Sequence, residues 1–288
     1  MDFEAFVKDI RDNRWNVYGS EVYEAGRLTY EYGDTQKSRY PIYSATKTIT
    51  SIGAGIAYDE GKIRLERSIL DYLPSETVDR MSKEQRVAFQ NITVERLLTM
   101  SVEGFPFRPE GESYLNYSLS CPLENVQTRR FNYSNISAYL VGVALTNAVQ
   151  EDLYQYLKRK LFDPLHIVDP VYTRCPDGYF YGASGMELTV HDLSRIGLLL
   201  YHGGAYERMR IVSEEYVKRA TAVQQMNREG GYGYFIWKYR DGFSINGKWK
   251  QKCYVLPERK LIITYLSHIK EDSHALLDSM ERHILGLK

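Results

Sequence analysis

The beginning of the chain alternates apolar and polar residues in the way that β-strands do. Residues 3 to 11 first show the spacing of a helix. Residues 15 to 23 and 27 to 32 then alternate on either side of the short turn Glu24-Ala25-Gly26. Alternation around a turn that contains glycine is typical of a hairpin. This region therefore predicts one helix followed by two antiparallel strands.

The end of the chain predicts three more strands and a closing helix. We expect the strands over residues 233 to 237, 250 to 256 and 260 to 267. Residues 272 to 285 place apolar side chains three or four positions apart, which indicates an amphipathic helix. Its apolar positions are Leu276, Leu277, Met280, Ile284 and Leu285.

The long middle of the chain, about 44 to 222, has helical patterns that are interrupted by loops rich in glycine, proline and asparagine, such as 104 to 117 and 169 to 185. Strands at both ends with helices between them predict an α/β fold of the α+β type. We expect a five-stranded antiparallel sheet, flanked by the terminal helices, with a large helical region inserted. The chain would form one domain over 1–288, with a sheet part (about 1–60 and 223–288), a helical part (about 61–222) and a cleft between them.

Composition narrows the classes of function. The 288 residues are 43% hydrophobic and carry 37 basic and 37 acidic side chains, so the formal net charge is zero. Nothing in this balance favours nucleic acid or an anionic membrane, and we expect a small molecule as the partner. Three widely spaced cysteines imply no disulfide framework. The first residues lack the apolar core of a signal peptide, which predicts a cytoplasmic protein. The oligomeric state is left open.

Several other chemistries lack their sequence signals. Residues 182 to 186 break the Gly-x-Ser-x-Gly pattern of the α/β-hydrolase elbow. The six histidines show no spacing of zinc ligands with one another or with the cysteines. Gly53-Ala54-Gly55 lacks the third glycine of a dinucleotide loop. We therefore expect neither a metal nor a cofactor.

The segment Ser44-Ala45-Thr46-Lys47 offers a candidate nucleophile and its base. It follows Pro41 and opens an apolar helical pattern, so Ser44 is predicted in the first turn, where free N–H groups favour negative charge. A lysine three residues on lies on the same helix face and can reach the hydroxyl. Burial and the helix field would lower the pKa of Lys47. A lone Ser-x-x-Lys pattern occurs by chance, and Ser44 as a simple helix cap is the alternative.

Two further segments point to the same chemistry. Tyr133-Ser134-Asn135 precedes an apolar run. A tyrosine can relay a proton to a leaving group, and an asparagine can hold both a lysine and a substrate carbonyl. Farther on, Gly247 lies within residues 244 to 251. A glycine there allows the backbone to approach a substrate, and the N–H that follows it can join that of Ser44 in an oxyanion hole.

With these three motifs in this order, the chain resembles the serine β-lactamase-like superfamily on its class C side. That side includes class C β-lactamases, D-alanyl-D-alanine carboxypeptidases and β-lactamase-fold carboxylesterases. The general template is Ser-x-x-Lys, a central triplet and Lys-Thr-Gly. Residues 95 to 101, 161 to 165, 182 to 186 and 232 to 234 also look like family segments, so the resemblance covers roughly 10 to 285. It implies a β-lactamase/transpeptidase-like fold and an acyl-enzyme on Ser44, with Lys47 and Tyr133 as catalytic partners.

The third motif departs from the family pattern and allows two registers. In the preferred one, Ile245-Asn246-Gly247 forms the motif and Lys248 supplies the oxyanion N–H. In the other, residues 248 to 250 form it and the glycine is lost. The preferred register keeps the glycine for steric reasons. It also puts Trp249 and Lys250 where relatives have small residues, so we expect an unusual wall to the substrate pocket.

These features predict a serine hydrolase that acts on small esters or amides. Asn135, Asn246, Gly247, Lys248 and Trp249 would form the substrate and oxyanion side of the site. Three alternatives remain: an acyltransferase that passes the acyl group to a metabolite, a β-lactamase or D-Ala-D-Ala peptidase, and a sensor that keeps its acyl group. Ile245 disfavours β-lactams, because relatives hold the β-lactam carboxylate partly through a basic residue at that position.

Overall fold

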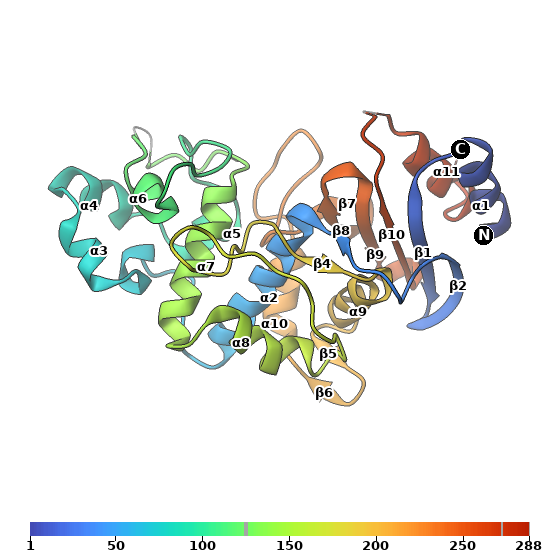
Figure 1. Cartoon of the computed structure of the whole chain (residues 1–288), viewed down its shortest axis with the longest axis horizontal. Coiled ribbons are helices and arrows are strands. Elements are labelled where there is room, and N and C mark those ends of the chain that lie inside the picture. The colour runs from blue at the N-terminus through green and yellow to red at the C-terminus, as the bar shows by residue number, and fades with distance from the viewer. Residues whose placement is uncertain (124–125, 272, 288) are drawn as a thin grey trace.

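The computed structural model describes residues 1–123, 126–271 and 273–287. Two parts lie side by side (Figure 1): a sheet with the first and last helices, and a group of helices from the middle of the chain. Both ends of the chain, blue and red in Figure 1, lie in the sheet part. This arrangement is the α+β fold that the sequence predicts.

The sheet of the described residues has six strands, one more than the predicted five. Their spatial order is β2 (Arg27–Gly33), β1 (Val17–Glu24), β10 (Leu261–Ser267), β9 (Gln251–Leu256), β8 (Gly242–Gly247) and β7 (Trp237–Tyr239). Every neighbouring pair is antiparallel. Strands β1 and β10 come from opposite ends of the chain, so their pairing closes the fold.

The prediction was wrong at the edge of the sheet nearest the helices. A strand was expected over residues 233 to 237, but β7 begins only at Trp237. Phe235 has a φ of 55°, in the left-handed region, so the backbone cannot run extended through it. Strand β8 was not expected, because Ser244, Asn246 and Gly247 give its sequence the look of a loop.

The terminal helices pack against one face of the sheet. Helix α1 (Phe3–Asp12) contacts α11 (Ala275–His283). Their buried side chains, such as Phe6 and Met280, join Tyr265 of β10 in one apolar cluster. The closing helix begins at Ala275; the first predicted position, Asp272, lies outside the described residues.

Helix α9 (Val190–Tyr201) contacts strands β1, β9 and β10. Gly197 sets how close this helix lies to the sheet, because an added Cβ would be 2.6 Å from Cys253 Sγ. No ordinary side chain fits in that space. The sheet is therefore anchored to the helical part through α9.

The helical part is built around two buried helices, α2 (Thr46–Asp59) and α7 (Asn135–Val149), which contact each other. Every residue from Thr46 to Ala57 is buried, as expected of a helix enclosed on all sides. The remaining elements are α3 (Ser75–Arg80), α4 (Lys83–Gln90), α5 (Val94–Leu98), α6 (Tyr114–Leu119), α8 (Leu153–Leu157), α10 (Glu214–Thr221), β3 (Tyr40–Pro41), β4 (Glu187–Leu188), β5 (Ala205–Tyr206) and β6 (Met209–Arg210). Helix α2 is thus the element that both parts share.

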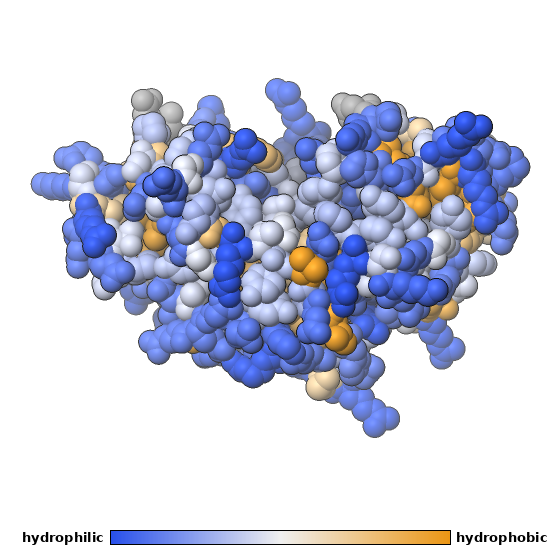
Figure 2. All heavy atoms as spheres, in the orientation of Figure 1, coloured by the Kyte–Doolittle hydropathy of each residue, from blue (hydrophilic) through white to orange (hydrophobic). Residues whose placement is uncertain are grey.

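The face of the molecule seen in Figure 2 is mostly hydrophilic, and its apolar residues lie in small separate patches. No helix within the described ranges is long and apolar enough to cross a membrane.

Packing around α2 gives a test of the core. Gly55→Ala should lower the free energy of unfolding by about 1–3 kcal/mol through overpacking, because its Cβ would lie 2.5 Å from the buried Tyr216 ring. Gly142→Ala in α7 is the matched control. Its Cβ would find its nearest atom at 3.4 Å, and alanine should gain up to about 1 kcal/mol in helix propensity. Urea denaturation measures both, and equal effects at the two positions would contradict this description of the core.

Candidate active site

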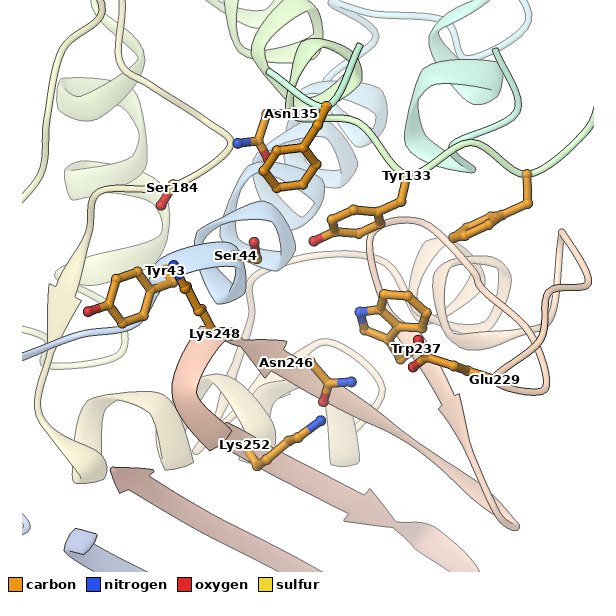
Figure 3. A pocket seen from close by; sticks show the side chains of 13 residues that line it. Tyr43, Ser44, Tyr133, Asn135, Ser184, Glu229, Trp237, Asn246, Lys248 and Lys252 are labelled. Atoms are coloured by element: carbon orange, nitrogen blue, oxygen red, sulfur yellow. The ribbon is translucent and has the colours of Figure 1, made fainter. Parts of the chain in front are cut away.

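Ser44 lies in a single 3₁₀ turn, Tyr43–Ala45, that leads directly into α2. Tyr43 before it has a φ of 48°, a left-handed conformation that non-glycine residues adopt rarely. The Ile42 N–H donates to the Met186 carbonyl and ties the turn to the neighbouring segment. The turn therefore presents the Ser44 side chain to a cavity at the start of a buried helix (Figure 3).

Lys47 is almost completely buried, with 1% of its surface exposed, and its ammonium has three acceptors. Its Nζ lies 3.1 Å from Ser44 Oγ, 2.7 Å from Asn135 Oδ1 and 2.9 Å from the Ala183 carbonyl oxygen. None of these acceptors carries a charge. Burial therefore lowers the pKa of Lys47 to about 7. At neutral pH a large fraction of this amine has a free lone pair, which can accept the Ser44 proton.

Tyr133 is the second group that contacts Ser44. Its phenol hydrogen-bonds with the Ser44 side chain, and its ring centroid lies 5.0 Å from Lys47 Nζ. Burial raises the pKa of Tyr133 to about 12, so the phenol keeps its proton at neutral pH. Trp237 and Tyr232 pack against the ring, with centroids 5.5 and 6.1 Å away. The hydroxyl is therefore held in place as a proton donor.

Asn135 is the first residue of α7, and this position explains how the second motif reaches the first. The Ser134 hydroxyl accepts from the Ile136 N–H and donates to the Pro106 carbonyl, which fixes the start of the helix. Because α7 packs against α2, the Asn135 side chain meets Lys47 across the helix interface. The contact joins residues 88 positions apart.

The third segment enters the site at the end of β8. An added Cβ on Gly247 would lie 2.2 Å from the Ile42 carbonyl oxygen, so only glycine lets the strand end lie against the Ser44 turn. Asn246, Gly247 and Lys248 line the cavity beside Ser44, while Ile245 is fully buried in the core. This is the arrangement of the preferred register.

The other register does not fit, because residues 248 to 250 form the turn between β8 and β9. Trp249 and Lys250 have left-handed φ values of 60° and 67° within it. Trp249 was expected in the pocket wall, and this was wrong: it does not line the cavity. It packs edge-on against Tyr43, with centroids 5.0 Å apart, and against His268 at 4.2 Å. Lys250 lines a smaller neighbouring cavity instead.

The cavity in front of Ser44 measures about 560 Å³. Its lining residues are Tyr43, Ser44, Phe107, Phe131, Tyr133, Asn135, Ser184, Glu229, Trp237, Asn246, Gly247, Lys248 and Lys252. Of the predicted site residues that face it, all three motifs contribute, and Lys47 lies behind Ser44. Within the described ranges, no group of three or more His, Cys, Asp or Glu side chains could hold a metal ion.

Sequence reasoning missed several of these residues. The Ala183 carbonyl comes from a segment noted only for its family resemblance, and its bond to Lys47 had no signal in the sequence. Lys252 reaches the cavity because it pairs with Asn246 across β8 and β9. Since β8 itself was not predicted, that register could not be either. Glu229 and Trp237 lie on either side of the turn that breaks the predicted strand.

A family model described as Beta-lactamase matches residues 5–285 of this chain. Three solved structures share its fold. A β-lactamase from Mycobacterium bovis is 18% identical, with 95% of this chain and 97% of that chain covered and a TM-score of 0.69. A penicillin-binding protein from Bacillus halodurans is 15% identical, with 96% and 99% covered and a TM-score of 0.74. An octameric penicillin-binding protein homologue from Pyrococcus abyssi is 18% identical, with 100% and 78% covered and a TM-score of 0.72.

The pKa of Lys47 can be measured without a substrate. Titration of ¹³C-labelled lysine side chains by NMR should show one resonance, lost in Lys47→Met, with a midpoint near the value of about 7 given by its burial. Asn135→Asp places a carboxylate where an uncharged oxygen now lies 2.7 Å from Nζ, and should raise that midpoint by at least one pH unit. A midpoint near 10 in the unmodified protein would contradict the electrostatic description of the site.

Proposed function

Because the chain belongs to the Beta-lactamase family, we propose that it is a serine hydrolase that cleaves small esters or amides through an acyl-enzyme on Ser44. One observation carries the proposal. Lys47 is buried among uncharged acceptors with its amine 3.1 Å from the Ser44 hydroxyl, and burial lowers its pKa to about 7. A structural lysine gains nothing from such a position, whereas a general base requires it.

Acylation begins when the neutral Lys47 amine takes the Ser44 proton. The Ser44 oxygen attacks the substrate carbonyl carbon, and the carbonyl oxygen becomes an oxyanion. We assign its stabilisation to the backbone N–H groups of Ser44 and Lys248, which flank the cavity from the 3₁₀ turn and from the end of β8. Asn135 holds Lys47 and can also donate to an acyl amide.

Collapse of the tetrahedral intermediate breaks the bond to the leaving group, which must receive a proton. Tyr133 supplies it, because its phenol contacts Ser44 and stays protonated at neutral pH. The Lys47 ammonium then returns a proton to Tyr133 through the Ser44 oxygen region, so the acylation step conserves protons. Water attacks the acyl-enzyme by the same route in reverse and releases the acid and free Ser44.

Esters and amides fit this cavity better than β-lactams do. The resemblance implies that relatives hold the β-lactam carboxylate partly through a basic residue at the position of Ile245, and Ile245 is fully buried and apolar. Lys252 brings an ammonium to the cavity from β9 instead, but the Glu229 carboxylate lines the same cavity. A lone carboxylate would therefore meet one attraction and one repulsion.

The nucleophile can be identified by covalent labelling. An activated phosphonate should add one mass to the tryptic peptide that contains Ser44, and Ser44→Ala should remove the label. Ser184→Ala is the matched control, because Ser184 lines the same cavity but has no bond to Lys47. Its labelling should persist at a similar rate. Label that survives Ser44→Ala would overturn the proposal.

Substrate class is tested by comparing a chromogenic cephalosporin with a short-chain p-nitrophenyl ester on the purified protein. The missing charge-assisted hydrogen bond at position 245 costs about 1.5–3 kcal/mol, which is roughly a tenfold to a hundredfold loss in kcat/KM. We expect the ester to have the higher kcat/KM by at least that factor. A cephalosporin value equal to or above that of the ester would favour a β-lactamase.

A further inference from the structure

Two opposite charges line the Ser44 cavity without pairing with each other. Lys252 lies on β9, directly across from Asn246 on β8, and Glu229 lies in the segment between α10 and β7 (Figure 3). Within the described ranges, no carboxylate lies within 4.0 Å of the Lys252 ammonium, and no basic side chain lies that close to the Glu229 carboxylate. Charges this near to one another usually form an ion pair when nothing is meant to lie between them.

The surroundings of Lys252 make its lack of a partner costly. The side chain is partly buried, and burial lowers its pKa to about 8, while the nearby Glu229 charge opposes that shift. It therefore remains mostly protonated at neutral pH. The Asn246 side-chain oxygen beside it is buried and accepts no hydrogen bond from the described residues. An unsatisfied donor and an unsatisfied acceptor thus meet at one point of the cavity wall.

The same residues connect the main cavity to a smaller one of about 210 Å³. Glu229, Trp237, Asn246 and Lys252 line both. The other titratable groups that carry charge in the smaller cavity are basic: Lys238, Lys250 and His274. The excess of positive charge on this side would favour a carboxylate near Lys252, and Glu229 is the one acidic group that lines either cavity among the described residues.

These charges lie on the side of Ser44 where the leaving group would be. Asn135 and Ser184 lie on one side of Ser44, and Tyr133, Trp237 and Glu229 on the other (Figure 3). The Glu229 charge also raises the pKa of Tyr133, which places this carboxylate close to the proposed proton donor. A group that receives its proton from Tyr133 would therefore extend between Glu229 and Lys252.

We propose that the site selects substrates whose leaving group carries both a carboxylate and an ammonium group. Lys252 binds the carboxylate, Glu229 binds the ammonium, and the Asn246 oxygen accepts one of its N–H bonds. The chemical class is an ester of a hydroxy amino acid or a side-chain amide of a diamino acid. This inference rests on the proposed acyl-enzyme: Ser44 takes the acyl group, and the amino acid leaves with the proton from Tyr133.

Four acetate esters that differ only in these charges test the inference. They are O-acetylhomoserine with both charges, 4-acetoxybutyrate with the carboxylate alone, 3-aminopropyl acetate with the ammonium alone, and propyl acetate with neither. Acetate release gives kcat/KM for each. We expect O-acetylhomoserine to exceed propyl acetate at least tenfold, since two charge-assisted contacts are gained. Each singly charged ester should gain less, because one of the two protein charges repels it.

Removing one protein charge should exchange the preferences in opposite directions. Lys252→Met should lower the ratio of O-acetylhomoserine to propyl acetate about tenfold and raise that of 3-aminopropyl acetate. Glu229→Gln should also lower the first ratio, but should raise that of 4-acetoxybutyrate. Lys218→Met is the control, because Lys218 is exposed on α10 and lines neither cavity. It should leave all four ratios unchanged.

A second readout does not depend on the acyl group. Homoserine should slow phosphonate labelling of Ser44 at a concentration at least tenfold lower than 4-hydroxybutyrate, 3-aminopropanol or propanol. Equal protection by the four alcohols, or equal loss on all four esters in Lys252→Met, would overturn the inference while Ser44 labelling leaves the proposed function standing. Absence of labelling at Ser44 would instead remove the proposed function.

Discussion

A lysine buried without a carboxylate is the constraint on which the rest of the site depends. The Lys47 ammonium is stabilised only by uncharged oxygens, so its charge is costly and its pKa falls to about 7. The fold must therefore supply acceptors at fixed positions from α7 and from the Ala183 segment. It must also exclude water and carboxylates, either of which would restore an ordinary pKa. The close packing of α2 meets these needs.

Close backbone approach is how the fold brings these groups together. Gly247 lets the end of β8 lie against the Ser44 turn, and Gly182 lies where a Cβ would be 2.8 Å from the Thr50 hydroxyl. The second contact holds the Ala183 carbonyl over the first turns of α2, within reach of Lys47. Each catalytic contact therefore depends on a place where a side chain is absent. The strained Tyr43 before Ser44 belongs to the same tight packing.

Local patterns predicted the parts of the structure that depend on local chemistry. The terminal helices, the first hairpin and the two last strands follow from periodicity, and the spacing of Ser44 and Lys47 follows from helix geometry. Strand β8 could not be found this way, because a strand with serine, asparagine and glycine is stabilised by its neighbours and not by its own pattern. Lys252 and Glu229 were missed for the same reason: sheet register and a turn at Phe235 place them in the cavity. Trp249 was misplaced because a left-handed turn directs it behind Tyr43.

The central claim is that Ser44, activated by Lys47, forms an acyl-enzyme whose oxyanion is held by two backbone N–H groups. A crystal structure of the protein after reaction with an activated phosphonate, which mimics the tetrahedral intermediate, tests it most directly. The account predicts a bond between Ser44 Oγ and phosphorus, one phosphoryl oxygen within hydrogen-bond distance of the Ser44 and Lys248 N–H groups, and the leaving side of the adduct next to Tyr133. An adduct on another side chain, or a phosphoryl oxygen that contacts neither N–H group, would contradict it.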